Sequence, residues 1–341
     1  MKKMPTISVI MPVYNAGEYI ENSVKSILAQ SFSDIEIICV NDCSKDDSLE
    51  KLQKLSAEDD RVKVIALEKN VGAGGARNAG LAVAAGEYIT FVDADDVIEP
   101  TLYQKAAACM EEGPDQIVWG LVEEHYNEKG EIAKNVVITP NDLKITDSKD
   151  LVKEILKLEE KTLFGYQWNS LYKAKIIKEH SIKIEDALFY EDYFFNLEFA
   201  KHMETLTTLN FVGYHYAKRP NNSITHLFTK NYFDLSYRRI ESMYDFCKER
   251  GFFDKYLYDM LGSRLLRYTL SAVCRNLSEK SGMNAADRKN WFLKVCDMEL
   301  YRSLLSECTP SNAVYSAVKF ALNHKCSGLA YAMGRLINLL G

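Results

Sequence analysis

Three carboxylates lie within four residues of the chain, directly after a short apolar run. Residues 88–92 are of the β-branched and aromatic types that suit a buried strand, whereas Asp93, Asp95 and Asp96 are not. The acids are therefore expected at the carboxyl end of the strand, where open α/β sheets bind their ligands. Neighbouring carboxylates repel one another unless a cation joins them, and Mg²⁺ is usually held by one or two carboxylates together with substrate phosphates. The pattern predicts a divalent-cation site, and an acidic start to the helix after Pro100 is the alternative.

A second acid pair, Glu191 and Asp192, lies among the aromatic residues of 189–195, where a helical pattern begins. A carboxylate that is partly shielded from water has a raised pKa, which suits a general base near neutral pH. The pair therefore predicts acid–base chemistry. The alternative is that both acids only stabilise the positive end of the helix.

A glycine-rich segment, 70–78, offers a third candidate site. Its glycines permit close approach of the backbone to a ligand, and Arg77 provides a planar, positive fork that suits phosphate. A dinucleotide-binding fingerprint is excluded, because Arg77 stands where the last glycine is needed and the segment follows the third strand rather than the first. The alternative is a glycine-rich turn in which Arg77 pairs with a neighbouring acid.

These residues need a scaffold, and the first hundred residues predict one. Strands at 7–14, 35–40, 62–67 and 88–92 alternate with helical patterns, which is typical of a parallel sheet with right-handed crossovers. Three of the strands end in polar residues, and in a parallel sheet such ends meet at the same edge. The polar ends are Tyr14 and Asn15, Asn41 and Asp42, and Asp93 to Asp95.

Composition limits the classes of function. The 341 residues, 47% hydrophobic and 26% charged, are those of a soluble globular protein with a sizeable core. A net charge of -6 argues against nucleic acid as a partner, since phosphate backbones require a basic face. The eight cysteines show no CxxC pair, so we expect neither zinc nor disulfides. No stretch resembles a signal peptide or a membrane span, which favours a cytoplasmic location.

Four motifs in order, at 8–15, 40–46, 70–72 and 91–96, resemble those of family 2 glycosyltransferases. The resemblance covers about residues 5–225. It implies the GT-A fold, an α/β nucleotide-sugar-binding fold with a mostly parallel sheet flanked by helices. The implied organisation is a glycosyltransferase domain at 1–228, with a nucleotide-binding half at about 1–100 and an acceptor half at about 101–228. A helical C-terminal region would follow at 229–341.

The resemblance also implies roles for individual residues. The end of the first strand and Asp42 would hold uracil and ribose, the loop containing Arg77 would lie by the nucleotide, and Asp93 would lie near the ribose. Asp95 would ligate a Mn²⁺ or Mg²⁺ ion that bridges the diphosphate. The substrate-binding residues expected in this half are Pro12, Val13, Tyr14, Asn15, Glu18, Asp42, Asn70, Gly74, Arg77, Asp93, Ala94 and Asp95.

In the acceptor half, the resemblance implies that Asp192 is the catalytic base and that Glu191 positions it or the sugar. Trp168 would stack on a sugar ring, although a place in the core is equally compatible with its type. Residues 214–225 resemble the closing loop of the family, in which Arg219 and Ser223 would contact the diphosphate. His215 would be a second metal ligand, with a structural histidine as the alternative.

The sequence thus predicts a metal-dependent, inverting transfer of sugar from a UDP-linked nucleotide donor to a hydroxyl of a glycan or lipid-linked acceptor in surface polysaccharide synthesis. Nucleotidyl transfer and a non-catalytic nucleotide- or sugar-binding module are the alternatives. Residues 313–340 are apolar with scattered basic residues, so these C-terminal helices either lie on the inner face of an anionic membrane or pack on their own domain.

Overall fold

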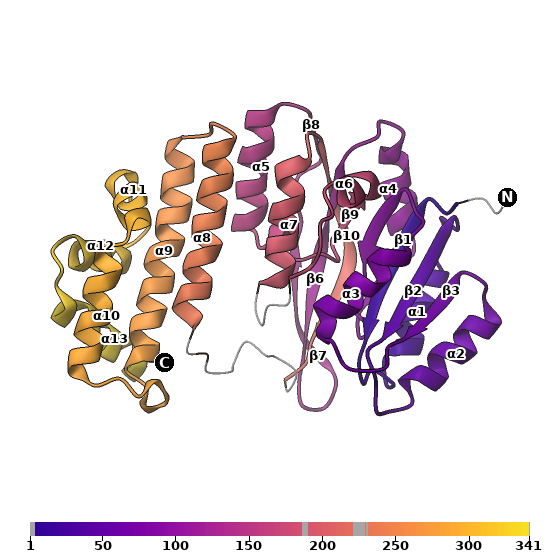
Figure 1. Cartoon of the computed structure of the whole chain (residues 1–341), viewed down its shortest axis with the longest axis horizontal. Coiled ribbons are helices and arrows are strands. Elements are labelled where there is room, and N and C mark those ends of the chain that lie inside the picture. Colours follow the sequence, from indigo (N-terminus) through magenta and orange to yellow (C-terminus); the bar gives the residue numbers. More distant parts are fainter. Residues whose placement is uncertain (1–3, 186–189, 221–228, 230, 341) are drawn as a thin grey trace. The chain divides into compact units, whose positions relative to one another are not determined.

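The computed structural model describes residues 4–185, 190–220, 229 and 231–340 (Figure 1). The chain divides into two compact units, residues 1–223 and 224–341. Each unit is described by itself below.

Within the described residues, ten strands of the first unit form one sheet in the order β3-β2-β1-β4-β9-β6-β10-β5, with β7 paired to β6 and β8 to β10. The strands are β1 (Ile7–Val13), β2 (Ile35–Asn41), β3 (Val62–Ala66), β4 (Tyr88–Phe91), β5 (Val97–Ile98), β6 (Gln116–Tyr126), β7 (Ile132–Ile138), β8 (Leu143–Ile145), β9 (Ser170–Lys173) and β10 (Leu206–Lys218). The pairs β3–β2, β2–β1, β1–β4 and β6–β10 are parallel, and the other pairs are antiparallel. The α/β prediction is confirmed.

Helices flank this sheet (Figure 1). Helix α1 connects β1 to β2, and α2 connects β2 to β3, so both crossovers run toward the β3 edge of the sheet. Helix α3 connects β3 to β4 and runs in the opposite direction. Because such connections are right-handed, α3 lies on the opposite face of the sheet from α1 and α2. The helices are α1 (Ile20–Leu28), α2 (Ser48–Glu58), α3 (Gly72–Val83), α4 (Leu102–Met110), α5 (Ser148–Glu160), α6 (Ala174–Glu179) and α7 (Glu191–His202).

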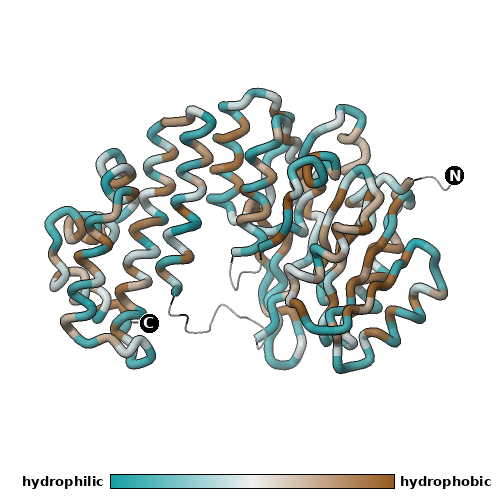
Figure 2. The backbone as a smooth tube through the Cα atoms, viewed as in Figure 1, coloured by the Kyte–Doolittle hydropathy of each residue, from teal (hydrophilic) through white to brown (hydrophobic). Residues whose placement is uncertain are grey.

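Strands β1 and β2 form the centre of the core, and their hydrophobic residues are visible as brown segments in Figure 2. Pro12 does not close β1, as the sequence suggested, because the strand continues to Val13 in register with β2. The backbone of Ile10 faces β4, and so does that of Pro12 two residues on. Strand β4 pairs with β1 only as far as Ile10. Pro12 lies beyond this pairing, so its missing N–H costs the sheet no hydrogen bond.

The second unit is helical, as predicted. Its helices are α8 (Tyr232–Glu249), α9 (Lys255–Asn276), α10 (Ala285–Cys296), α11 (Glu299–Glu307), α12 (Ala313–Asn323) and α13 (Ser327–Leu340). Helix α9 packs against α8, α11, α12 and α13 and so forms the centre of this unit. None of the helices in the described ranges is long and apolar enough to cross a membrane.

Candidate active site

The loops that follow β1 and β2 are tied together, as expected for strands that end at one edge of the sheet. The backbone N–H of Asn15 donates to Ser44 Oγ at 3.1 Å, and the N–H of Lys45 donates to Asn15 Oδ1 at 2.7 Å. Asn15 and Cys43 have positive φ angles of 50° and 60°. Such conformations persist where the surroundings enforce them, often at functional sites. The exposed side chain of Tyr14 lies directly beside this junction.

The glycine-rich segment is not a loop, because α3 begins at Gly72. Asp42 explains the difference. Its carboxylate, which is buried, accepts hydrogen bonds from the N–H groups of Val71 at 2.7 Å and Gly72 at 2.9 Å, and so satisfies donors at the start of the helix. Asn70 adds a bond from Nδ2 to the carbonyl of Asp42. Asp42 therefore anchors α3 to the end of β2, and its predicted contact with uracil or ribose stays a prediction.

Arg77 joins the two acid clusters that the sequence singled out. Its guanidinium contacts Asp93 Oδ1 at 2.8 Å, Glu191 Oε1 at 3.1 Å and Asp192 Oδ1 at 3.4 Å. The residue is only 5% exposed. A guanidinium buried among three carboxylates is held firmly, because its removal would leave these acids close together without a cation. Arg77 is thus paired with acids, from a helix rather than from a turn, and its predicted place beside the nucleotide stays a prediction.

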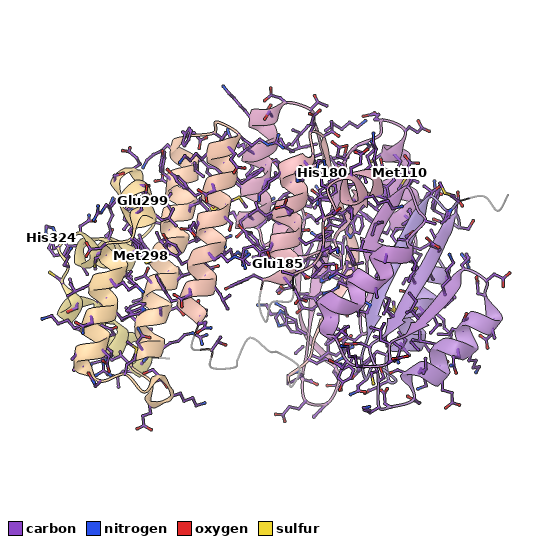
Figure 3. All side chains as sticks on the ribbon, viewed as in Figure 1. Met110, His180, Glu185, Met298, Glu299 and His324 are labelled. Atoms are coloured by element: carbon purple, nitrogen blue, oxygen red, sulfur yellow. The ribbon has the colours of Figure 1, made fainter. Side chains whose placement is uncertain are left out.

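Gly74 and Asn78, two other residues of α3, place Arg77 between the two acid clusters. A Cβ atom on Gly74 would lie 2.9 Å from Ile184 Cγ2 and 3.2 Å from the carbonyl oxygen of Glu185, a residue labelled in Figure 3. Asn78 holds both backbone groups of Ile184, donating to its oxygen at 2.8 Å and accepting from its nitrogen at 2.9 Å. Gly74 thus permits contact with the chain itself, where the sequence suggested contact with the nucleotide.

Asp192 has the electrostatics of a base that works near neutral pH. Burial raises the pKa of Asp192 to about 7, with Arg77 opposing the rise and Asp93 and Glu191 adding to it. The side chain still has 20% of its surface exposed, so a substrate can reach it. A carboxylate with this pKa accepts a proton from an acceptor and releases it again at physiological pH.

Asp95 is paired with Arg219. The guanidinium donates to Asp95 Oδ2 at 3.0 Å and to the Asp95 carbonyl at 3.2 Å. It also lies over the ring of Tyr19 at 4.0 Å, and the ring of Tyr126 is 5.4 Å away. Arg219, Tyr19 and Tyr126, together with Glu18, line a hollow of about 540 Å³, a volume in the range of small-molecule sites. Asp95 keeps 37% of its side chain exposed.

Tyr214 and Asp96 were not predicted to have these roles, and they fix the acid turn to β10. The Tyr214 hydroxyl donates to Asp96 Oδ2 at 2.8 Å and accepts from the N–H of Asp93 at 3.1 Å. Asp96 also accepts from the N–H of Ala217, and burial with the nearby Asp95 raises the pKa of Asp96 well above the usual value. The sequence offered no signal for this contact, because the partners are 118 residues apart.

Two predicted contacts of the acceptor half are corrected. The ring of Trp168 is 2% exposed and stacks on Tyr166 at 4.4 Å and on Tyr214 at 4.0 Å, so it has no face for a sugar. His215 hydrogen-bonds Glu124 through Nδ1 at 2.7 Å and Glu99 through Nε2 at 2.9 Å. Both of its nitrogens are engaged with carboxylates, and neither is available to a metal.

The remaining predicted residues border the same edge. Pro12 and Val13 end β1, and Ala94 separates the two acids of the turn. Ser223 lies outside the described residues. In the described ranges, no group of three or more His, Cys, Asp or Glu side chains is arranged to hold a metal ion. The chemistry of the turn is compatible with the predicted ion, because the Asp95 carboxylate is 37% exposed and Mg²⁺ takes its other ligands from phosphates and water; metal binding stays a prediction.

Comparisons with known proteins identify the family of the chain. The model of the family described as Glycosyl transferase family 2 matches residues 8–181, just over half of the chain. The uncharacterized glycosyltransferase EpsJ of Bacillus subtilis is 30% identical over 221 residues, which cover 64% of this chain and 63% of EpsJ. TuaG of the same organism, provisionally named for teichuronic acid biosynthesis, is 48% identical over 92 residues, which cover 27% of this chain and 36% of TuaG. The chain thus spans less than two thirds of these relatives.

Among solved structures, residues 1–349 of S. aureus TarS in complex with UDP have a TM-score of 0.69 at 19% identity, and the match covers 98% of this chain and 92% of that one. The same TarS segment with UDP-GlcNAc gives equal values. The likeness establishes a common fold.

Proposed function

The chain belongs to glycosyl transferase family 2, and from that premise we propose that it moves a sugar from a UDP-linked donor to a hydroxyl of a glycan or lipid-linked acceptor, with inversion at the sugar carbon. The observation that carries the proposal is the contact of Arg77 with Asp93, Glu191 and Asp192. It connects an acid turn suited to a nucleotide with an acid suited to an acceptor. A simple nucleotide-binding module would have no need for the second group.

In the proposed reaction, the acceptor hydroxyl attacks the C1 atom of the donor sugar while the bond from C1 to the diphosphate oxygen breaks. The electron pair of that bond leaves with UDP, and the hydroxyl proton goes to the carboxylate of Asp192. Arg77 keeps this carboxylate in place and moderates its pKa, which burial alone would raise further. Glu191 shares the Nη1 atom of Arg77 with Asp192 and so fixes the guanidinium on the acceptor side.

The donor would lie at the edge formed by Tyr14, Asn15 and the hollow around Tyr19. Arg219 already lies in that hollow, and a fixed guanidinium suits a diphosphate. A Mn²⁺ or Mg²⁺ ion held by Asp95 would offset the charge that develops on the leaving diphosphate. Support for UDP comes from TarS, which was solved with UDP and with UDP-GlcNAc. The name of TuaG, which refers to teichuronic acid biosynthesis, supports a place in polysaccharide synthesis.

A membrane-facing role is proposed for the C-terminal helices at the inner face of the cell membrane. From residue 308 to the end, the sequence contains no Asp or Glu but includes Lys319, Lys325 and Arg335. Large hydrophobic side chains are exposed on the same two helices: Val314 and Phe320 on α12, and Leu329, Leu336, Ile337 and Leu339 on α13. Exposed apolar groups with positive charge are favourable at an anionic lipid surface.

The deciding experiment is to incubate the protein with UDP- and GDP-sugars, Mn²⁺ and a panel of glycan and lipid-linked acceptors, and to identify the products. Acceptor-dependent release of UDP is expected. Release of pyrophosphate would instead identify a nucleotidyltransferase. A donor that binds, with no UDP released on any acceptor even at high enzyme concentration, would favour a binding module.

A further inference from the structure

The helical unit contains a pocket of its own. Its volume is about 290 Å³, and its walls come from the start of α8, the end of α9 and helix α10. Its lining includes Tyr232, Arg275, Trp291 and Lys294, together with Met298, which is labelled in Figure 3. The volume is at the lower end of the range for small-molecule sites, which suits one sugar ring better than a nucleotide.

The two cations of this pocket have no anionic partner among the described residues. In the part of the chain that the structure describes, neither the Arg275 guanidinium nor the Lys294 ammonium has a hydrogen bond or an ion pair. The guanidinium instead stacks over the ring of Tyr232 at 4.2 Å from its centroid. Stacking fixes the plane of the guanidinium and leaves its N–H edge free, which is the arrangement that binds a carboxylate or phosphate with two hydrogen bonds.

The rest of the lining favours a sugar as the carrier of that anion. Trp291 is half-buried and packs edge-to-face against Phe233 at 5.1 Å. An indole offers an apolar surface beside a polar N–H, which suits the mixed C–H and hydroxyl surface of a sugar. Asn276 and Ser281 add neutral hydrogen-bonding groups, and Asp234 is the single acidic residue among the described lining residues. The lining therefore keeps a net positive charge.

Arg275 and Lys294 also have a structural role. Arg275 lies in the last turn of α9 and Lys294 in the last turn of α10, where a cation stabilises the helix dipole. That role accounts for a cation at each helix end. It does not account for the fact that both side chains line the same aromatic cavity, where a single anion can meet both.

We propose that this pocket binds an anionic sugar unit, one that carries a phosphate or a carboxylate, as part of the acceptor glycan. The assignment of the unit to the acceptor rests on the proposed glycosyltransferase function, whereas binding itself does not. A second point of attachment in the helical unit would increase affinity for a repetitive acceptor, since the two sites share one chain.

The test uses ¹⁹F NMR on the full chain labelled with 5-fluorotryptophan. The protein has three tryptophans, and Trp119 and Trp168 are buried in the first unit, so they serve as internal controls. Glucose 6-phosphate and glucuronate are titrated at constant ionic strength, with glucose as the neutral arm. We expect at least one of the two anionic sugars to shift the Trp291 resonance, whereas glucose should leave it unchanged. Whichever anionic sugar binds more tightly identifies phosphate or carboxylate as the group recognised.

Variants define the site. Arg275→Gln and Lys294→Gln are each expected to weaken binding by at least tenfold, whereas Lys289→Gln, on the same helix α10 but outside the pocket, should leave it unchanged. An unmoved Trp291 resonance, or an equal response to glucose, would overturn the proposal. UDP binding, measured separately by calorimetry, reports on the donor site, so failure of that measurement would count against the proposed function and not against this pocket.

Discussion

At the scale of single residues, the proposed chemistry depends on one arginine and the acids around it. Arg77 is a buried cation between Asp93, which belongs to the acid turn, and Asp192, which begins α7. The effect of burial on Asp192 exceeds the effect of Arg77, and the carboxyl is therefore half protonated near pH 7. In the proposed reaction Asp192 can act as a base because part of its carboxyl is ionised near neutral pH.

The first prediction concerns catalysis. Asp192→Asn should lower kcat by roughly 10²- to 10⁴-fold, the usual contribution of a general base, while the dissociation constant for UDP stays within about twofold. In the wild type, kcat/KM should rise with pH and level off above about 7, because only the ionised Asp192 accepts a proton. Steady-state kinetics across pH 5–9 would check both. Glu198→Gln, on the same helix, is the control, and normal turnover in Asp192→Asn would remove the assignment.

The second prediction concerns stability. The folded-state pKa of Asp192 is about 7 and the unfolded value is 3.8, so the folded state binds more protons in between and loses stability as pH rises through this window. Asn cannot ionise, and the variant should be more stable than the wild type by roughly 2–4 kcal/mol at pH 8. The gap should narrow steadily toward pH 4. Urea unfolding at several pH values measures it, and a destabilised variant at pH 8 would mean that the pairing with Arg77 outweighs burial.

The sequence identified the acids but not their neighbours. Asp93, Asp95 and Asp192 were predicted from acidic types at the end of apolar or aromatic runs, a local signal. The roles of Asn78 and Tyr214 depend on contacts across more than a hundred residues, for which a single sequence has no pattern. Trp168 was placed at the acceptor because an aromatic type alone does not tell whether its faces are covered.

At the scale of elements, the same limits hold. The alternation of strands and helices predicted the parallel sheet, because buried strands and amphipathic helices have clear periods. The glycine-rich segment was predicted as a loop because glycine disfavours helices by up to about 1 kcal/mol per residue. Capping by Asp42 and packing on residues 184–185 outweigh that cost, and neither contact is local.

Strand β10 provides the third prediction. Tyr214→Phe removes the hydroxyl that links Asp96 to the N–H of Asp93, and leaving these buried groups unpaired costs about 1–3 kcal/mol each. The acid turn should then lose its fixed position, with UDP affinity in the presence of Mn²⁺ falling by fivefold or more. Calorimetry measures this loss. Tyr216→Phe, two residues along the same strand, should have little effect, and equal effects of both variants would show that the hydroxyl link is unimportant.

At the scale of the whole molecule, one chain contains two units: the first unit, which has the sheet and the proposed active site, and the helical second unit. The helical unit carries the pocket around Arg275 and, on α12 and α13, the exposed apolar and basic side chains. Both features suit a role in bringing the enzyme to its acceptor, whereas the residues proposed for the transfer reaction lie in the first unit.

The fourth prediction tests the membrane-facing role. The full chain should sediment with vesicles that contain phosphatidylglycerol, and binding should weaken as salt rises because headgroup attraction is screened. Replacing both Leu336 and Leu339 with Asp should reduce binding by tenfold or more and leave UDP affinity unchanged. The matched control is Ile132→Asp with Val137→Asp on β7, which removes exposed apolar groups elsewhere. If the two double variants bind vesicles equally well, the C-terminal helices are not the contact.

The ion pair between Arg219 and Asp95 has a consequence for the order of events. The Arg219 guanidinium acts as an internal counter-ion of Asp95, and under the proposed function a free divalent ion would have to compete with it. A diphosphate would give Arg219 a new partner and would thereby release Asp95. Metal and donor would therefore reinforce each other, each improving the affinity of the other by the same factor, as thermodynamic linkage requires. The enzyme would ignore either one alone at low concentration and respond to the pair.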